Sequence, residues 1–188
     1  MAVNILDFFN VASQKQFSRD FFMRVRQITV QGITLNGENE LVYAKTASLP
    51  GRDIEDKPIN YSGQIFHANG RAVYPGSDSY AIEFYMDQDL DLRKKLERVS
   101  RSTFNHETTS GALCMPGEDS YIILDILKAP CGQGNVGGGA WVTAETIKLV
   151  GVNIRTIGEV AYQIADGTGE IMSLPVTFSY HWYEDFSK

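Results

Sequence analysis

The sequence has few of the residues on which most metal and disulfide sites depend. It contains 2 cysteines and 3 histidines among 188 residues, and His67, His106 and His181 lie far apart in it. Cys114 and Cys131 form no CxxC pair, so neither a disulfide framework nor a zinc site is indicated. We expect free thiols, no bound metal, and histidines that lie on the surface or on a strand face.

Basic charge and long apolar runs are also scarce. With 17 Lys and Arg against 23 Asp and Glu, the net charge is −6, which disfavours a protein that holds nucleic acid through phosphate contacts. No apolar run approaches the ~20 residues needed to span a bilayer, and the N-terminus lacks a basic region followed by an apolar one. The sequence predicts a globular protein made in the cytosol, without a membrane partner.

Motifs for catalysis and nucleotide binding are missing or out of context. Residues 132–137 (GQGNVG) match GxGxxG, but β-branched sequence follows them, where a dinucleotide site needs the start of a helix. There is no P-loop lysine and no GxSxG nucleophile elbow. We therefore expect no enzyme and no cofactor. Residues 129–140, with 5 of the 17 glycines, are interpreted as a flexible surface loop.

The clearest pattern in the chain runs from Tyr80 to Arg101. Apolar residues first alternate, with Tyr80, Ile82, Phe84 and Met86 on one face, which predicts a half-buried strand. Leu92, Leu96 and Val99 then recur at helical spacing. We expect a helix over 89–101, with Asp87 or Asp89 as its N-cap and five basic residues on its outer face: Arg93, Lys94, Lys95, Arg98 and Arg101.

Strands dominate the rest of the chain. Further strands are predicted over 22–30, 41–49, 59–68, 121–127, 143–154, 159–166 and 171–182. Turns are predicted at Asn36-Gly37, Asn69-Gly70, Pro75-Gly76 and 167–169. Residues 49–58 (LPGRDIEDKP) break the strand pattern and are predicted to form an exposed loop.

The predicted sheet has little protection at its edges. Its strands are long and apolar and contain few prolines, whereas natural edge strands are blunted or paired. Arg24 and Arg26 share one face of the 22–30 strand, which is either solvated or an interface. One physical solution is that the edges pair with neighbouring copies and close a barrel across subunits.

Three blocks of the chain resemble contractile-phage tail tube proteins, the T4-like tube family. The first is Lys148 to Glu184, which carries Ile-Gly-Glu-Val and ends in Val-Thr-Phe-Ser-Tyr. Ala44 to Gly63 resembles the family's strand, Leu-Pro, acidic loop and strand, and Tyr80 to Arg101 resembles its strand-to-helix segment. The three blocks occur in the family's order and cover roughly half of the chain.

The resemblance implies a mainly β fold with one flanking α-helix. It would be a small β-barrel or sandwich over 21–188 behind an N-terminal arm over 1–20, and its sheet would continue across subunits into a hexameric ring. Stacked rings would form a tail tube in the virion, assembled in the host cytoplasm. Expected partners are further copies, the sheath, tape-measure, baseplate or hub and tail-terminator proteins, and genomic DNA passing an acidic lumen without specific binding.

The resemblance also assigns contact residues. Subunit and ring contacts are expected from the N-terminal arm and from the 49–56 segment: Phe8, Phe9, Leu49, Pro50, Gly51, Arg52, Asp53, Ile54, Glu55 and Asp56. The helix would lie outside, and Lys94, Lys95 and Arg98 could then face the sheath. An equally simple interpretation of this basic face is that it is solvated.

Two other functions remain open at this stage. Within the same class, the chain could form the tube of a phage-like injection or type VI secretion system, or a tube initiator at the baseplate. The alternative of another class is a β-barrel that binds a small ligand, with the 129–140 loop as its lid.

Overall fold

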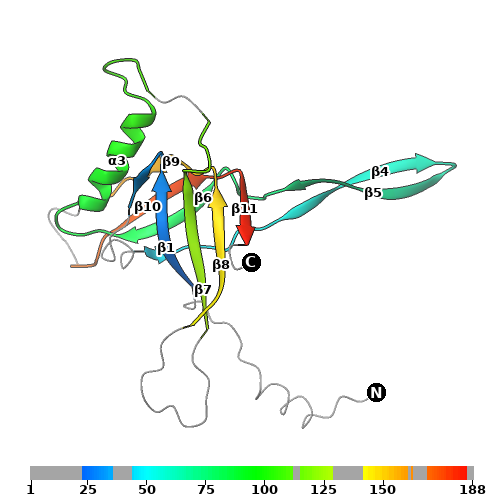
Figure 1. Ribbon diagram of the computed structural model, residues 1–188, viewed down its shortest axis with the longest axis horizontal. Coiled ribbons are helices and arrows are strands. Elements are labelled where there is room, and N and C mark those ends of the chain that lie inside the picture. The colour runs from blue at the N-terminus through cyan, green and yellow to red at the C-terminus, as the bar shows by residue number, and fades with distance from the viewer. Residues whose placement is uncertain are drawn as a thin grey trace, which may run out of the picture.

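The structure is a computed structural model that describes residues 23–35, 44–111, 115–128, 142–160, 162 and 169–185. In these residues the fold is mainly β with one helix, as the sequence predicted, and it has two parts (Figure 1). Two sheets and the helix α3 (Asp91–Thr103) form the body. A two-stranded arm extends away from that body. The expected N-terminal arm over 1–20 and the 129–140 loop lie outside the described residues.

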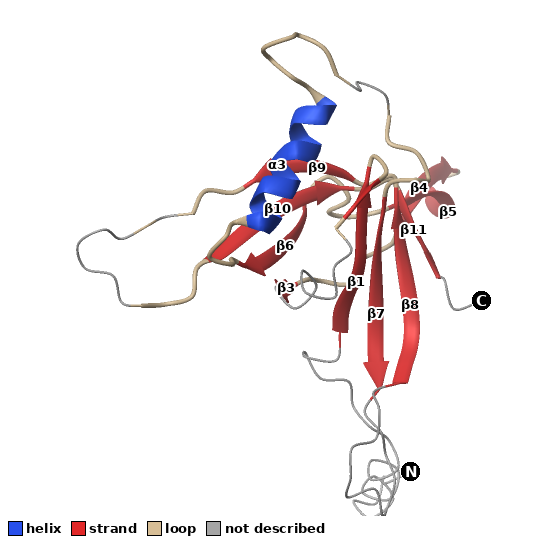
Figure 2. Cartoon of the chain, turned by 60° about the vertical axis from the view of Figure 1, so that its left-hand side comes forward, coloured by secondary structure: helices blue, strands red, loops and turns tan. Residues whose placement is uncertain are grey.

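The body is a sandwich of two antiparallel sheets. The large sheet has the order β11-β8-β7-β1-β2, and its strands are β1 (Met23–Val30), β2 (Ile33–Thr34), β7 (Tyr121–Lys128), β8 (Val142–Val150) and β11 (Trp182–Asp185). The small sheet has the order β3-β6-β10-β9, from β3 (Ala44–Thr46), β6 (Tyr80–Tyr85), β10 (Ser173–Ser179) and β9 (Asn153–Ile157). Figure 2 shows the helix beside the small sheet, next to β9 and β10.

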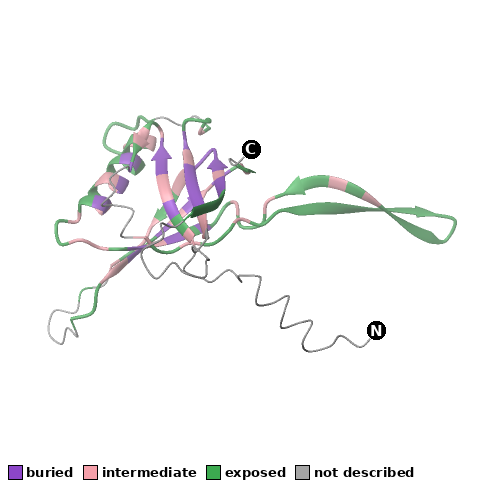
Figure 3. Cartoon of the chain, turned by 60° about the horizontal axis from the view of Figure 1, so that its bottom comes forward, coloured by how far each residue is buried: buried purple, intermediate pink, exposed green. Residues whose placement is uncertain are grey.

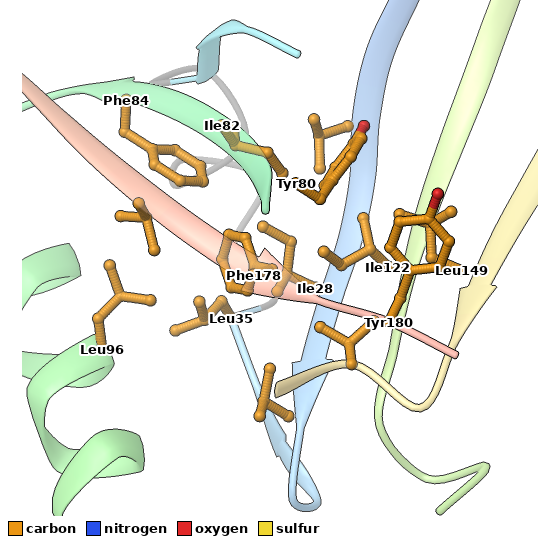
Figure 4. Packing of buried hydrophobic residues seen from close by; sticks show 14 of the residues in the cluster. Ile28, Leu35, Tyr80, Ile82, Phe84, Leu96, Ile122, Leu149, Phe178 and Tyr180 are labelled. Carbon is orange, nitrogen blue, oxygen red and sulfur yellow. The ribbon is translucent and has the colours of Figure 1, made fainter. Parts of the chain in front are cut away.

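Side chains from both sheets and from the helix fill the space between them (Figure 4). Ile28, Ile122 and Leu149 come from the large sheet, and Ile82 and Phe178 from the small sheet; each is at most 1% exposed. The helix contributes the three residues predicted from its spacing, Leu92, Leu96 and Val99. Burial of each such side chain stabilises the fold by about 1.5–3 kcal/mol, so this cluster fixes the position of the helix.

The prediction for β6 is confirmed, but the predicted start of the helix is wrong. Tyr80, Ile82 and Phe84 are buried, as the alternation required. The helix begins at Asp91, after Leu90 in a left-handed conformation with φ 55°, and no side chain caps it. Neither Asp87 nor Asp89 serves as the N-cap, because the chain turns sharply at Leu90 before the helix starts.

Two predicted strands are each divided between the sheets. The 143–154 segment forms β8 in the large sheet and then begins β9 in the small one. Gly151, with φ 70°, makes this crossing, and a Cβ there would lie 2.1 Å from the His181 ring. The 171–182 segment likewise forms β10 and then begins β11. Apolar residues continue through both crossings because both sheets face the same core, so the sequence pattern did not reveal them.

A bulge in β1 changes which residues face the core. Pairing with β7 moves from Val25–Leu124 to Gln27–Ile123, so Arg26 is the extra residue of β1. Before the bulge, Val25 is on the core side and Arg24 is on the outer face. Beyond the bulge the alternation shifts by one residue: Ile28 and Val30 enter the core, and the side chain of Gln27 bonds to Tyr121 on the outer face.

Two other predicted features differ or lie outside the structure. Residues 159, 160 and 162 form no strand, and the rest of the predicted 159–166 strand is outside the described part of the chain. The Pro75-Gly76 turn is confirmed, with φ 73° at Gly76. Asn36-Gly37 is not among the described residues; the turn that the structure shows in this region is at Gln31-Gly32.

The contrast between body and arm predicts unequal costs for removing the same side chain. Phe178→Ala, in the core, should lower the free energy of unfolding by about 3–5 kcal/mol. Phe66→Ala, at a position 51% exposed on the arm, should change it by less than about 1 kcal/mol. Chemical denaturation of the monomer measures both, and equal losses would contradict the assignment of Phe178 to the core.

Candidate assembly surfaces

The arm is the most exposed part of the described chain. It consists of β4 (Asp53–Tyr61) and β5 (Gln64–Val73), which pair only with each other in the described residues. All 9 residues of β4 are exposed, and Figure 3 shows the arm projecting from the body as a nearly continuous exposed ribbon. The sequence predicted an exposed loop over residues 49–58. Exposure is confirmed except at Pro50, which is half-buried, whereas the loop is wrong from Asp53 onward.

The sequence predicted a turn at Asn69-Gly70, but the turn of the arm lies at Ser62-Gly63 and Gly70 lies at a bulge. Ser62 and Gly63 have φ 50° and 80° and connect the two strands as a tight hairpin. Asn69-Gly70, the predicted turn, lies inside β5. A Cβ on Gly70 would lie 2.7 Å from the carbonyl oxygen of Glu55, so glycine is needed for close approach at the bulge, not for a turn.

The arm has one strongly apolar face. Directly opposite residues share a face, so the pairs Ile59–Phe66, Tyr61–Gln64 and Lys57–Ala68 lie together. On this face, Ile59, Tyr61 and Phe66 are 55%, 73% and 51% exposed. The other face carries the pairs Asn60–Ile65, Pro58–His67 and Asp56–Asn69 and is more polar. We call the Ile59, Tyr61 and Phe66 side the apolar face of the arm.

An exposed apolar ribbon of this kind points to an interface. An isolated two-stranded hairpin is marginally stable in water, and a contiguous exposed apolar patch marks a contact surface. The 49–56 segment predicted for subunit contacts covers only the root and the first part of the arm. The missed residues were Ile59, Tyr61 and Phe66, whose alternation around Ser62-Gly63 is the signal that could have identified a hairpin. Phe8 and Phe9 lie outside the described residues.

Tyrosines hold the root of the arm on the body. The hydroxyl of Tyr80 in β6 donates to the carbonyl oxygen of Ser48, just before the arm, at 2.5 Å. Tyr74, just after the arm, packs edge-on against Tyr183 of β11 with ring centroids 5.5 Å apart. Burial raises the pKa of the Tyr80 hydroxyl above its ordinary value, and the neighbouring Tyr180 raises it further. Both ends of the arm are therefore attached to the body, one on each sheet.

The helix displays the basic face that the sequence predicted. Lys94 and Arg98 are exposed, and Lys95 is partly buried. The Nζ of Lys94 lies 3.9 Å from a carboxylate oxygen of Asp91, and Arg93 pairs with Glu97 at 3.0 Å. Lys94, Lys95 and Arg98 are spaced to lie on adjacent turns of one helix face. The three positions are thus brought together.

The outer face of the large sheet carries a network of polar side chains that the sequence analysis missed. Gln27 donates to the hydroxyl of Tyr121 at 2.8 Å and to that of Thr29 at 3.2 Å. The Thr29 and Thr34 hydroxyls lie 3.1 Å apart, and the Nζ of Lys148 lies 5.0 Å from the centre of the Tyr121 ring. These groups satisfy one another's hydrogen-bonding capacity across neighbouring strands.

Asp125 is the buried charge of this face. It is 0% exposed, and its carboxylate accepts from Arg24 at 2.9 and 3.0 Å and from the Thr146 hydroxyl at 2.9 Å; Arg26 lies 3.5 Å away. A buried carboxylate needs such partners, because an unpaired one is costly. Two guanidinium groups share one carboxylate. Asp125 with its two arginines therefore forms a cluster with a net charge of +1.

The described residues form no metal centre and no long apolar helix. No group of three or more His, Cys, Asp or Glu side chains among them is placed to hold a metal ion. Within the same residues, no helix is long and apolar enough to cross a membrane. The surfaces that this part of the chain offers are the arm, the helix face and the large sheet with its edges.

The sandwich with its flanking helix and projecting hairpin has an overall fold similar to that of a solved structure. A chain in the cryo-EM structure of the anti-feeding prophage (AFP) baseplate superposes with a TM-score of 0.59 at 11% identity, over 92% of this chain and 97% of that one. A crystal structure of Hcp protein is more distant, with a TM-score of 0.41 at 12% identity over 87% and 99% of the two chains. No family model matches the sequence, and none of the curated proteins is similar to it.

The anchoring of the arm predicts a specific effect of Tyr80→Phe. Without the hydroxyl, the Ser48 carbonyl loses its donor, at a cost of about 1 kcal/mol in unfolding free energy. The pKa of Tyr80 is higher in the folded state than in the unfolded state, because its hydroxyl is buried. Above pH ~10 the unfolded chain loses this proton while the folded chain keeps it, so the contribution of Tyr80 to stability is present below pH ~10 and is lost as the pH rises above ~10. The variant should therefore lose less stability than the parent between about pH 9 and 11.

Denaturation curves at several pH values test this effect. Tyr61→Phe is the matched control, because Tyr61 is 73% exposed at the tip of the arm, and its curves should coincide with those of the parent. A Tyr80→Phe variant as sensitive to alkali as the parent would show that the buried hydroxyl is not responsible.

Proposed function

We propose that this chain is a structural subunit of a contractile injection apparatus and that its function is self-assembly. The proposal rests on the arm, because contact with another molecule would bury the apolar face that the arm exposes to water. The fold shared with the AFP baseplate chain supports it, because that chain comes from such an assembly. Within this class we favour a tail tube subunit of a contractile phage tail, in which hexameric rings stack into a conduit.

In this role the parts of the chain have separate tasks. The sandwich, whose core is packed with side chains from both sheets and the helix, is the rigid unit that is repeated (Figure 4). The arm reaches a neighbouring copy and buries its apolar face there. DNA and the tape-measure protein would pass through the ring without binding to it. The sheath would lie outside, on the helix side, and baseplate or hub and terminator proteins would meet the ends of the tube. The particle is a virion tail assembled in the host cytoplasm.

A tube initiator at the baseplate is the second candidate. It is favoured by one observation, namely that the solved structure with the higher TM-score is a baseplate. A main tube subunit assembles without limit, whereas an initiator forms one ring and stops until other proteins extend it. The same purified protein therefore distinguishes the two: electron micrographs show long tubes in the first case and isolated rings in the second. The tube of a phage-like injection or secretion system would also give tubes, and a neighbouring gene for a phage capsid would separate it from a phage tail.

Replacing the apolar face of the arm should prevent assembly. Ile59→Ser, Tyr61→Ser and Phe66→Ser together remove the three exposed apolar side chains that we expect a neighbour to cover, and Ile65→Ser, 62% exposed on the opposite face, is the control. Negative-stain microscopy should show rings or tubes for the parent and the control, and single particles for the triple variant. A parent that stays monomeric at high concentration, or a triple variant that assembles normally, would contradict the proposal.

The basic helix face predicts contact with the sheath. Reversing the charges of Lys94, Lys95 and Arg98 to Glu should weaken co-assembly with the sheath protein by about tenfold, because rim charges steer such contacts. Arg155→Glu, an exposed position on β9, is the control for a general charge effect. Co-sedimentation of sheath with preformed tubes measures this effect. Equal sheath binding by the triple variant and the parent would mean that the basic face is only solvated.

A further inference from the structure

The cluster around Asp125 contains more positive charge than its carboxylate balances. Arg24 donates to Oδ2 of Asp125 through Nε at 3.0 Å and Nη2 at 2.9 Å, and the Thr146 hydroxyl donates to Oδ1 at 2.9 Å. The carboxylate is 0% exposed, and these contacts already give it an ion pair and hydrogen bonds to both oxygens. Arg26 is therefore a second guanidinium beside a carboxylate that is already paired.

The guanidinium of Arg26 has donors that the buried ion pair does not use. Its Nη1 lies 3.5 Å from Oδ1 of Asp125, so the two charges attract each other without a well-formed hydrogen bond. Its N–H groups donate to no acceptor on the described residues, although a guanidinium has several donors. The side chains of Arg24 and Arg26 are 54% and 41% exposed, so an anion can reach both from solvent.

The bulge in β1 brings these donors to one face of the large sheet. Arg24 lies directly opposite Asp125 of β7, the neighbouring strand (Figure 2). Arg26 is the extra residue of the bulge, and it contacts the same carboxylate. Bulges are over-represented next to functional sites, where they redirect a side chain. We call Arg24 and Arg26 on this face the arginine pair.

The excess charge of the outer face lies at the arginine pair. The strand register places two further charged residues of the described chain on this face, Lys148 of β8 and Glu184 of β11. They lie directly opposite each other, so their charges offset. An anion that approaches this face therefore meets its uncompensated positive charge at the arginine pair.

We propose that the arginine pair is a binding site for a phosphate group on the outer face of the large sheet. The inference goes beyond the proposed function, because one copy of the chain holds both arginines and the carboxylate that positions them. Guanidinium groups match phosphate oxygens, and a phosphate offers more oxygens than a carboxylate, so it can accept from both arginines at once. Asp125 holds the pair in place before binding, which lowers the entropy cost of ordering it.

The phosphate group can belong to a small ester or to a nucleic-acid backbone, and two probes distinguish these sources. Inorganic phosphate is followed by the broadening of its phosphorus NMR signal when protein is added, and a labelled oligothymidylate by fluorescence anisotropy. Both measurements work whether the protein is monomeric or assembled. Tighter binding of the oligothymidylate, counted per phosphate, indicates a backbone, and tighter binding of inorganic phosphate indicates a small ester.

Substitution of Arg26 tests the site without removing the buried ion pair. Arg26→Gln leaves Asp125 paired with Arg24 and Thr146, so the variant should fold, and it should raise the half-saturating phosphate concentration by at least about tenfold. Arg26→Lys keeps the charge but loses the planar fork and should bind with intermediate affinity. Arg155→Gln, at an exposed position of β9, is the matched control and should bind like the parent.

Competing salts separate a defined site from general attraction between charges. Sodium sulfate, a tetrahedral oxyanion, should displace phosphate from the parent at lower ionic strength than sodium chloride does, because chloride only screens the charge. Equal displacement by both salts, no binding of either probe, or equal binding by Arg26→Gln and the parent would overturn this inference. Since none of these measurements depends on ring formation, the proposed function would stand in each case.

Discussion

Apolar side chains need a covering partner, and in this molecule those of the body obtain one from within while those of the arm do not. The core side chains of the two sheets and α3 are almost fully buried against one another. Ile59, Tyr61 and Phe66, in contrast, remain at least half exposed on a ribbon that pairs only with itself in the described chain. Transfer of such groups from water is favourable by about 25 cal/mol per Å² of apolar surface, so the arm provides the driving force for association that the body does not need.

The completeness of the body makes this division of tasks possible. Because no residue of the arm belongs to the core of the sandwich, we expect that the arm can leave its neighbour without unfolding the subunit. The tyrosines at its root keep it connected to both sheets: Tyr80 to Ser48 on one side and Tyr74 to Tyr183 on the other. On the outer face of the large sheet, the buried carboxylate of Asp125 fixes the positions of Arg24 and Arg26 in a similar way.

The sequence predicted the parts of the fold that local periodicity controls. The alternation of β6 and the Leu92, Leu96 and Val99 stripe were correct because each serves a single core face. Periodicity could not show that Gly151 carries the chain from one sheet to the other, or that a bulge at Arg26 exchanges the faces of β1. Both depend on tertiary contacts. Residues 49–58 were predicted as a loop because Pro50, Gly51 and the acidic residues there favour a turn in isolation, and residues 59–68 were predicted as one strand, which the turn at Ser62-Gly63 divides. The role of Asp125 could not be predicted, because only the fold brings Arg24 and Arg26 to its carboxylate.

The central claim is that one copy is incomplete and that further copies complete it. Native mass spectrometry of the purified protein over a range of concentrations tests this most directly. The account predicts a ring of six copies, with stacked multiples of six as the concentration rises. A single species with the mass of one 21.0 kDa chain at every concentration would contradict it.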